Sequence, residues 1–155
     1  EKTVKRRIPA LKSGDIIPTF TPRPPTPTPQ APGDDPYAVA EEAYRFYEAS
    51  EYGEAIVKFA TAIKLHPYYG EKYAASHGAV YSQIVLSEWY NMKGVSYYYT
   101  KQYWGSIEDF TKAIRWNPTS GVAYYNRGVS HWALGNYGPG REDFAKACEI
   151  DAKHC

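Results

Sequence analysis

The chain has 155 residues and a formal net charge of +1 at pH 7, enough chain for one domain with a hydrophobic core. No run of about 20 apolar residues occurs, so no segment is predicted to span a membrane. The two cysteines and four histidines fit no zinc or catalytic spacing, and we expect no enzyme activity, no cofactor and no metal.

Residue types divide the chain into an arm and a body. Eight of the twelve prolines lie in residues 1–33, which carry six basic and two acidic side chains. All sixteen tyrosines and all four tryptophans follow, in a remainder with twelve basic and fifteen acidic side chains. A basic arm on a mildly acidic body favours attraction between two copies; the plainer alternative is a basic tail that stays solvated.

The arm is predicted to be extended over residues 1–35. Thr19–Pro32 alternates proline with small polar residues, and proline fixes φ and removes the amide donor, so this segment is polyproline II or irregular. It is either a semi-rigid linker or a segment that docks on a protein surface. Candidate docking anchors are Ile16, Ile17, Phe20, Pro24, Pro25, Pro27 and Pro29. Threonines beside or between prolines suit O-glycosylation, namely Thr19, Thr21, Thr26 and Thr28.

The body shows helical periodicity from Pro36 onward. Three segments are copies of one another, each with Tyr first, Phe seven residues later and Ala three further on: Tyr52–Pro67, Tyr103–Pro118 and Tyr137–Ala152. Each follows a helical segment with one apolar face, namely Pro36–Ala49, Ser87–Thr100 and Gly121–Leu134. A small residue on that face (Ala43, Gly94 or Gly128) is expected to let the facing helix approach closely.

Two segments depart from this regular pattern. Residues 70–86 add half a repeat, and we expect one long helix over about 71–100, with a separate additional helix as the alternative. Gly138-Pro139-Gly140 stands where polar helix-forming residues are usual, and is expected to delay or loosen the start of the last helix. Pro67 and Pro118 are expected to close the first two copies.

The pattern resembles the 34-residue tetratricopeptide repeat, most closely over Tyr124–Asp151. The resemblance covers about 36–67 and 87–152. It implies an all-α, right-handed solenoid of three helical hairpins preceded by the non-helical arm. The predicted domains are an arm over 1–35 and a repeat domain over 36–155, divided into 36–69, 70–120 and 121–155.

In this family the first helix of each repeat lines a concave groove. The groove residues that the resemblance implies here are Tyr37, Tyr44, Tyr47, Asn91, Tyr98, Tyr99, Tyr125 and Trp132. The subfamily that clamps a C-terminal carboxylate places cations at positions that here hold Ala40, Tyr44, Met92, Val122 and Asn126, so that activity is not expected. Tyrosine faces suit proline rings and equally suit sugars.

A repeated unit buries its apolar side only by stacking, which favours a binding or assembly protein. Our first hypothesis is self-assembly into an extracellular filament or surface layer, with the arm of one subunit docking on the next. The main alternative is an adaptor that binds a peptide or proline-rich segment of another envelope protein. A lesser alternative is carbohydrate binding through the aromatic groove. We expect no nucleic-acid partner, because the basic residues of the arm face an acidic body.

The Thr-Pro tract and the richness in Tyr and Trp favour a bacterial protein that is extracellular or on the cell surface, with a cytoplasmic location as the alternative. Since the chain begins at Glu1, either an initiator or signal peptide has been removed or the sequence is an excerpt. Cys148 and Cys155 are candidates for a disulfide. On a continuous helix their spacing holds them roughly 10 Å apart, too far to bridge, whereas a break beyond Asp151 brings them together.

Overall fold

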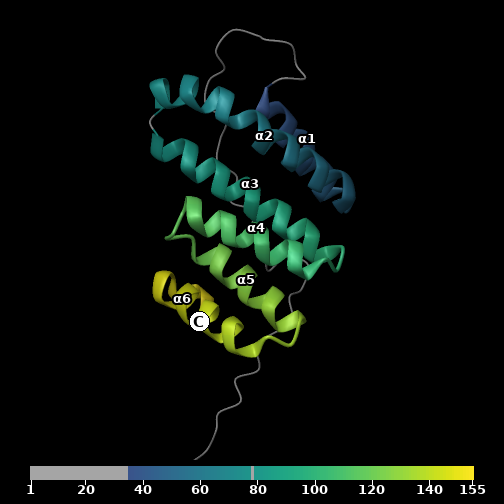
Figure 1. Ribbon diagram of the computed structural model, residues 1–155, viewed down its shortest axis with the longest axis vertical. Coiled ribbons are helices and arrows are strands. Elements are labelled where there is room, and N and C mark those ends of the chain that lie inside the picture. Colours follow the sequence, from purple (N-terminus) through teal and green to yellow (C-terminus); the bar gives the residue numbers. More distant parts are fainter. Residues whose placement is uncertain (1–34, 78) are drawn as a thin grey trace, which may run out of the picture.

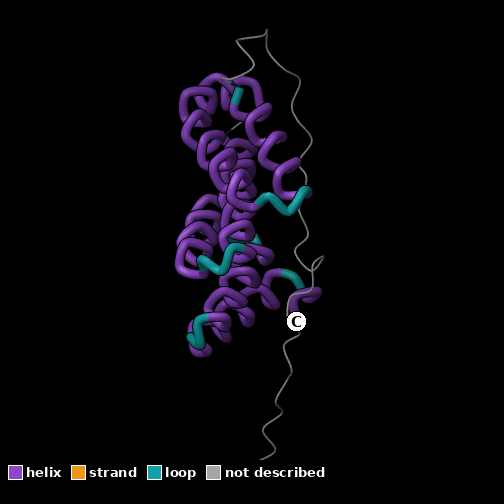
Figure 2. The backbone as a smooth tube through the Cα atoms, turned by 90° about the vertical axis from the view of Figure 1, so that its right-hand side faces the viewer, coloured by secondary structure: helices purple, strands orange, loops and turns teal. Residues whose placement is uncertain are grey.

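The computed structural model describes residues 35–77 and 79–155, with side chains for 35–66 and 82–155. The arm, its predicted anchors and its four threonines lie outside the described residues. The described part is all-helical, and its elements are α1 (Pro36–Glu48), α2 (Tyr52–His77), α3 (Ala79–Tyr99), α4 (Tyr103–Trp116), α5 (Gly121–Ala133), α6 (Tyr137–Ile150) and the 3₁₀ turn η1 (Ala152–His154). Successive helices follow one another down the long axis (Figure 1), joined by short loops (Figure 2).

The six helices form three hairpins, α1–α2, α3–α4 and α5–α6. At the start of α1, Asp35 accepts a hydrogen bond from the Tyr37 amide at 2.9 Å, and Pro36 occupies a first-turn position that needs no amide donor. The turn inside each hairpin has one left-handed residue at the same repeat position, with φ of 62° at Ser50, 61° at Lys101 and 78° at Gly135. None of the described helices is both long and apolar enough to cross a membrane.

The repeated apolar positions form the core. Phe59 and Phe110 are fully buried, and each belongs to the second helix of its hairpin. A Cβ atom added to Gly94 would lie 2.9 Å from Cε1 of Phe110, and one added to Gly128 would lie 2.9 Å from Cε1 of Phe144. The expectation that small residues let the paired helices approach closely is therefore confirmed at both glycines.

The expected long helix over 71–100 is wrong, and so is the alternative of a separate additional helix. The added half-repeat lengthens two helices at once: α2 reaches 26 residues and ends at His77, and α3 begins at Ala79 and has 21 residues. The helix α2 continues through Pro67, so that proline does not close the first copy, whereas α4 ends at Trp116, before Pro118. The two long helices lie on either side of Gly78, and glycine is the poorest helix former after proline.

The expected delay of the last helix is also wrong, because α6 begins at Tyr137. Pro139 lies in the first helical turn, where the amide that proline lacks has no partner inside a helix in any case. Gly140 donates from its amide to the Asn136 carbonyl at 3.2 Å. A Cβ atom on Gly140 would lie 2.6 Å from Nε1 of Trp132, so the glycine allows α6 to pack closely on α5.

Candidate functional site

The first helices of the three hairpins, α1, α3 and α5, form one layer. The rings of Tyr37 on α1 and Trp89 on α3 lie 5.4 Å apart, edge to face. Farther along the layer, the Asn126 side-chain amide on α5 donates to Oδ1 of Asn91 on α3 at 3.0 Å. The residues in these contacts are 35 or more positions apart in sequence. The predicted groove residues all belong to this first-helix layer.

Two of the predicted residues are largely buried. Tyr37 is 7% exposed and Asn91 is 8% exposed. Tyr37 packs against His66 as well as Trp89, and Asn91 accepts the amide of Asn126. Their described contacts hold neighbouring helices together, which is a structural role within the layer.

Tyr44 is hydrogen-bonded to a buried carboxylate of the same layer. Its hydroxyl donates to Oε1 of Glu88 at 3.0 Å, and its ring packs edge to face on Phe59. Burial raises the pKa of Tyr44, and the negative charge of Glu88 raises it further, so the hydroxyl stays protonated and remains a donor. Glu88 is only 8% exposed and contributes an acidic side chain to this layer.

Three other predicted residues, Tyr47, Tyr98 and Tyr99, meet two tyrosines that were not predicted as site residues. Tyr52 stacks on Tyr99 at 4.7 Å with 14° between the ring planes, and Tyr103 lies 5.3 Å from Tyr98. Tyr47 contacts both Tyr52 and Tyr99, and Tyr98 contacts Tyr99. We call these five residues the tyrosine cluster. Burial, followed by the neighbouring hydroxyls, raises the pKa of Tyr47 and of Tyr98.

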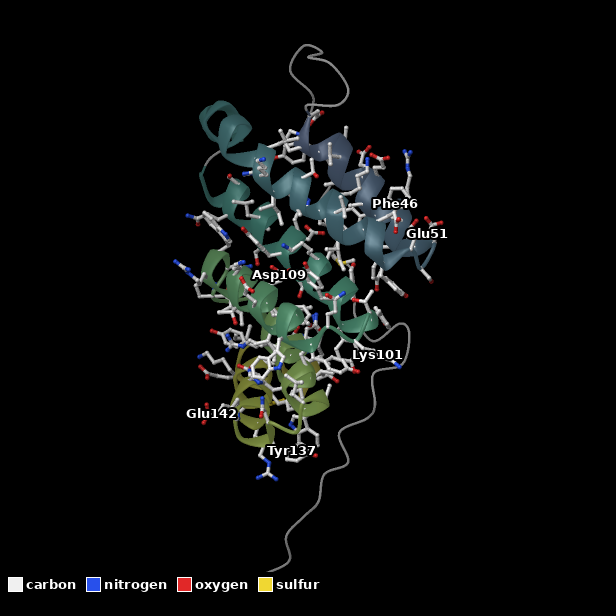
Figure 3. All side chains as sticks on the ribbon, turned by 45° about the vertical axis from the view of Figure 1, so that its right-hand side comes forward. Phe46, Glu51, Lys101, Asp109, Tyr137 and Glu142 are labelled. Carbon is white, nitrogen blue, oxygen red and sulfur yellow. A yellow bond between two sulfur atoms is a disulfide. The ribbon has the colours of Figure 1, made fainter. Side chains whose placement is uncertain are left out.

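The tyrosine cluster lies where the first helix of a hairpin ends and the second begins. Tyr52 and Tyr103 are the first residues of α2 and α4, and they are the repeated Tyr that opens each copied segment. That repetition was the signal that could have assigned them to the site. Figure 3 shows Glu51, Lys101 and Tyr137, all at or beside such turns, following one another down the molecule.

Tyr125 and Trp132 belong to a separate aromatic group on the last hairpin. Phe144 lies 5.4 Å from Tyr125 and 6.0 Å from Trp132, and Tyr137 lies 5.0 Å from Trp132. Among the described residues no ring contact links this group to the tyrosine cluster. Of the predicted residues, the structure therefore brings together Tyr47, Tyr98 and Tyr99 and places Tyr125 and Trp132 apart from them.

The two cysteines form a disulfide. Helix α6 ends at Ile150, Asp151 is extended with φ −147° and ψ 113°, and η1 returns the chain so that the Cα atoms of Cys148 and Cys155 are 4.7 Å apart. The break beyond Asp151 makes the link feasible, since a continuous helix would separate the two sulfurs.

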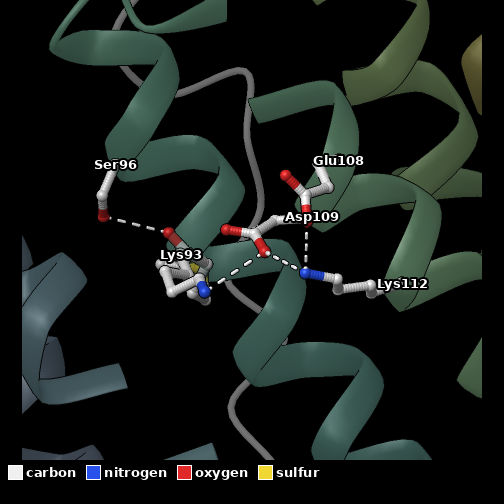
Figure 4. Close-up of polar contacts among 6 residues, drawn as sticks. Lys93, Ser96, Glu108, Asp109 and Lys112 are labelled. Carbon is white, nitrogen blue, oxygen red and sulfur yellow. Dashed lines mark hydrogen bonds and ion pairs between the residues drawn. The ribbon is translucent and has the colours of Figure 1, made fainter. Parts of the chain in front are cut away.

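In each hairpin an ion pair joins the two helices. Nζ of Lys93 lies 3.2 Å from Oδ1 of Asp109 (Figure 4), and the Arg127 guanidinium donates two hydrogen bonds, of 2.7 and 2.8 Å, to the Asp143 carboxylate. In the first hairpin the signs are exchanged, because Glu42 on α1 pairs with Lys58 on α2 at 2.7 Å. Burial raises the pKa of Asp109, and the nearby lysines oppose that rise.

The described residues include no group of three or more His, Cys, Asp or Glu side chains arranged to hold a metal ion. The first-helix layer offers tyrosine rings, the buried carboxylate of Glu88 and side-chain amides.

The tetratricopeptide-repeat family model matches residues 88–120 and 122–154. The solved structures include the first such domain of human RPAP3, with TM-score 0.62 and 17% identity over 77% of this chain and 81% of that one. The fold is that of a tetratricopeptide-repeat solenoid. The Arabidopsis OM64 domain has TM-score 0.62 and 19% identity over 76% and 84% of the two chains. The first domain of Spaghetti (RPAP3), solved with the HSP90 peptide SRMEEVD, has TM-score 0.61 and 17% identity over 77% and 82%.

The two tetratricopeptide repeats that the family model matches contain most of α3, all of α4 and α6, α5 except its first residue, and η1. No curated protein sequence matches the chain significantly. The first hairpin, α1–α2, lies outside the match, yet Ala43, Phe59 and Ala62 are buried at the small, Phe and Ala positions of the repeat pattern.

Proposed function

We propose that the repeat domain is a non-enzymatic protein-interaction module that binds an extended, basic, proline-containing segment on the first-helix layer. One observation carries this proposal: tyrosines and a buried acidic side chain are gathered on a layer whose predicted groove positions hold no lysine or arginine. Tyrosine rings with hydroxyls at their edges provide flat apolar faces for proline rings and donors for peptide carbonyls.

Glu88 determines which charge the layer favours. A carboxylate that is 8% exposed and already accepts the Tyr44 hydroxyl attracts lysine or arginine and repels an acidic segment. The Spaghetti domains were solved with the acidic peptide SRMEEVD. This chain has the same fold and the opposite charge preference on the layer, so its ligand belongs to a different class.

The arm is the segment within the chain that has this chemistry, and we propose that the arm of one subunit docks on the repeat domain of another. Residues 1–33 carry an excess of four positive charges, and the remainder carries an excess of three negative charges. A head-to-tail contact of this kind does not close on itself and builds a filament. The alternatives are a proline-rich segment of another envelope protein and, with less support, a glycan.

We further propose that the protein works outside the cytoplasm, as an extracellular or surface protein. A disulfide between Cys148 and the exposed Cys155 supports an oxidising compartment, because exposed disulfides are rare in the cytosol. Intact-mass measurement of the natively produced protein tests this. A fully reduced mass without glycan on the threonines would contradict it.

The ligand class is tested with a labelled peptide of residues 1–33, which carries both the basic side chains and the prolines of the arm, and the full chain. Fluorescence anisotropy should show binding, and Glu88→Gln should weaken it about three- to tenfold because a buried attractive charge is lost. Tyr99→Ala should weaken it by a similar factor. Glu108→Gln removes a carboxylate from an exposed side chain on α4 and is the matched control. Equal affinity of all four proteins would contradict the proposed site.

Self-assembly is tested by removing residues 1–33. Light scattering and negative-stain microscopy should show long particles for the full chain and a soluble monomer for the truncated chain, with unchanged helicity by circular dichroism. If the truncated chain still forms long particles, the arm is not the connector. If the full chain stays small but binds the proline-rich segment of another protein, the module is an adaptor.

A further inference from the structure

The C-terminal turn folds back onto the first helix of the last hairpin. The ring of His154 in η1 stacks on Tyr125 of α5 at 5.5 Å with 30° between the planes. His154 also covers the start of α5, since a Cβ atom on Gly121 would lie 3.1 Å from its Cδ2. Tyr125 is one of the predicted groove residues, and its other described ring neighbour is Phe144.

Besides this packing on α5, the described interactions of the turn are the disulfide, local backbone hydrogen bonds and surface interactions. The backbone bonds, from the His154 amide to the Asp151 carbonyl at 2.9 Å and from the Cys155 amide to the Ala152 carbonyl at 3.1 Å, lie within the turn and do not tie it to α5. Asp151 accepts a hydrogen bond from the Lys153 amide at 3.0 Å and forms an ion pair with the Lys153 side chain. Both side chains of that ion pair are well exposed, and such pairs contribute little. The disulfide between Cys148 and Cys155 therefore provides the main restraint that keeps His154 on Tyr125.

We propose that Cys148–Cys155 is a reversible thiol–disulfide site that holds His154 as a cover on Tyr125. Reduction lets the turn leave, which removes the histidine ring and extends the binding face to the third repeat. This inference rests on the proposed function, because it treats Tyr125 as part of that face. The reductant is a small dithiol or a dithiol protein: it transfers two electrons and two protons, the S–S bond breaks to give two cysteine thiols, and the dithiol becomes a disulfide.

The position of the site suits this chemistry. Cys155 is exposed and Cys148 is half-buried, so a thiolate can attack the outer sulfur without unfolding the hairpin. The remaining interactions of α6 with α5, including the Arg127–Asp143 pair, do not involve the turn. The cover can therefore open while the repeat stays folded.

The cover itself is tested on the full chain by proton NMR, without any ligand. In the oxidised protein a nuclear Overhauser contact should join the His154 and Tyr125 rings, and dithiothreitol should abolish it. The double variant Cys148→Ser/Cys155→Ser should lack the contact without reductant and be unaffected by dithiothreitol. Persistence of the ring contact after full reduction would overturn the inference, since the disulfide would then not hold the cover.

Its effect on binding is tested with the labelled 1–33 peptide. Reduced protein should bind about three- to tenfold more tightly than oxidised protein, the range that one aromatic contact provides. His154→Ala, which keeps the disulfide and lacks the covering ring, should bind like the reduced protein in both redox states. Equal binding by the oxidised, reduced and His154→Ala proteins would overturn the inference. Absence of binding in every form would overturn the proposed function instead, and the NMR result alone would then decide whether the cover exists.

Discussion

At the scale of single residues, the glycines of α6 differ sharply in what surrounds them. A Cβ atom on Gly140 would meet the Trp132 ring and the Gly128 carbonyl oxygen, whereas one on Gly138 would meet nothing within 4 Å. Gly140→Ala should therefore lower the free energy of unfolding by about 2 kcal/mol or more, because the ring has to shift in a packed interface. Gly138→Ala should be neutral or raise it by up to about 1 kcal/mol. Urea unfolding measures both, and equal effects would contradict the close packing at Gly140.

His66 makes stability depend on pH. The side chain is 2% exposed, packed edge to face on Trp89, and burial lowers its pKa from 6.5 to about 4. The unfolded chain therefore takes up a proton as the pH falls below about 6.5, while the folded chain does so only near pH 4. Stability contributed by the neutral ring is full above about pH 6.5 and is lost as the pH falls through that window.

The free energy of unfolding should consequently fall by about 2 kcal/mol between pH 7.5 and 4.5, as measured by urea denaturation. Burial lowers the pKa of His131 and of His154 in the same direction, so part of the slope belongs to them. His66→Gln provides the comparison, and its slope should be clearly shallower. A slope unchanged by that substitution would show that His66 is not the group that titrates.

At the scale of helices, the ion pair inside each hairpin lies at the same two repeat positions, but which helix carries the acidic residue differs between hairpins. Lys58 pairs with Glu42 in the first hairpin, whereas the acidic partner lies on the second helix in the other two. Lys58→Glu should cost about 0.5–1 kcal/mol, because it places two carboxylates together at a partly exposed site. Adding Glu42→Lys should restore most of that loss in urea unfolding. A double variant no more stable than the single one would show that the pair contributes nothing.

In the third hairpin, exchanging both charges should not restore the stability of the native pair. Asp143 is 5% exposed and accepts two hydrogen bonds from Arg127, which also donates to Thr111 of α4 at 3.1 Å. An aspartate at position 127 has no N–H group to donate to Thr111, so the exchanged pair loses this third hydrogen bond. The matched double exchange, Arg127→Asp with Asp143→Arg, should therefore remain about 2 kcal/mol or more below the native chain.

The repeats could be predicted from sequence because each copied segment carries its own apolar spacing, and Gly94 and Gly128 already indicated close helix packing. The position of the break in the added half-repeat could not be predicted. Gly78 is a point at which a helix can end, but a single glycine inside a helical pattern does not dictate a break, so the sequence does not decide which helices residues 67–77 and 79–86 extend. The sequence around Gly140 predicts a delayed helix start because the residue that explains the glycine, Trp132, is adjacent to it only in the folded hairpin. The tyrosine cluster likewise depends on stacking between repeats, which places Tyr52 beside Tyr99.

At the scale of the whole molecule, the continuous first-helix layer forms only when the repeats stack, because each hairpin contributes a single helix to it. Tyr44 and Glu88 come from different hairpins, as do Asn91 and Asn126. A face of this kind exists only while neighbouring hairpins stay packed, so binding and repeat stacking are coupled. A ligand that spans α1 and α3 should accordingly stabilise the first hairpin, which lies at one end of the array (Figure 1).

The charge division between arm and body leads to a prediction for assembly. Residues 1–33 are basic and the remainder is acidic, so contacts between subunits through the arm gain from attraction that salt screens. Raising NaCl from about 20 mM to about 500 mM shortens the Debye length from roughly 20 Å to about 4 Å, and should weaken association of the full chain by about tenfold or more. Light scattering across a dilution series measures this. The truncated chain, which lacks the basic arm, should show no such dependence. Association that strengthens with salt would indicate an apolar contact, and the arm would then act through its prolines and Phe20 rather than through its charges.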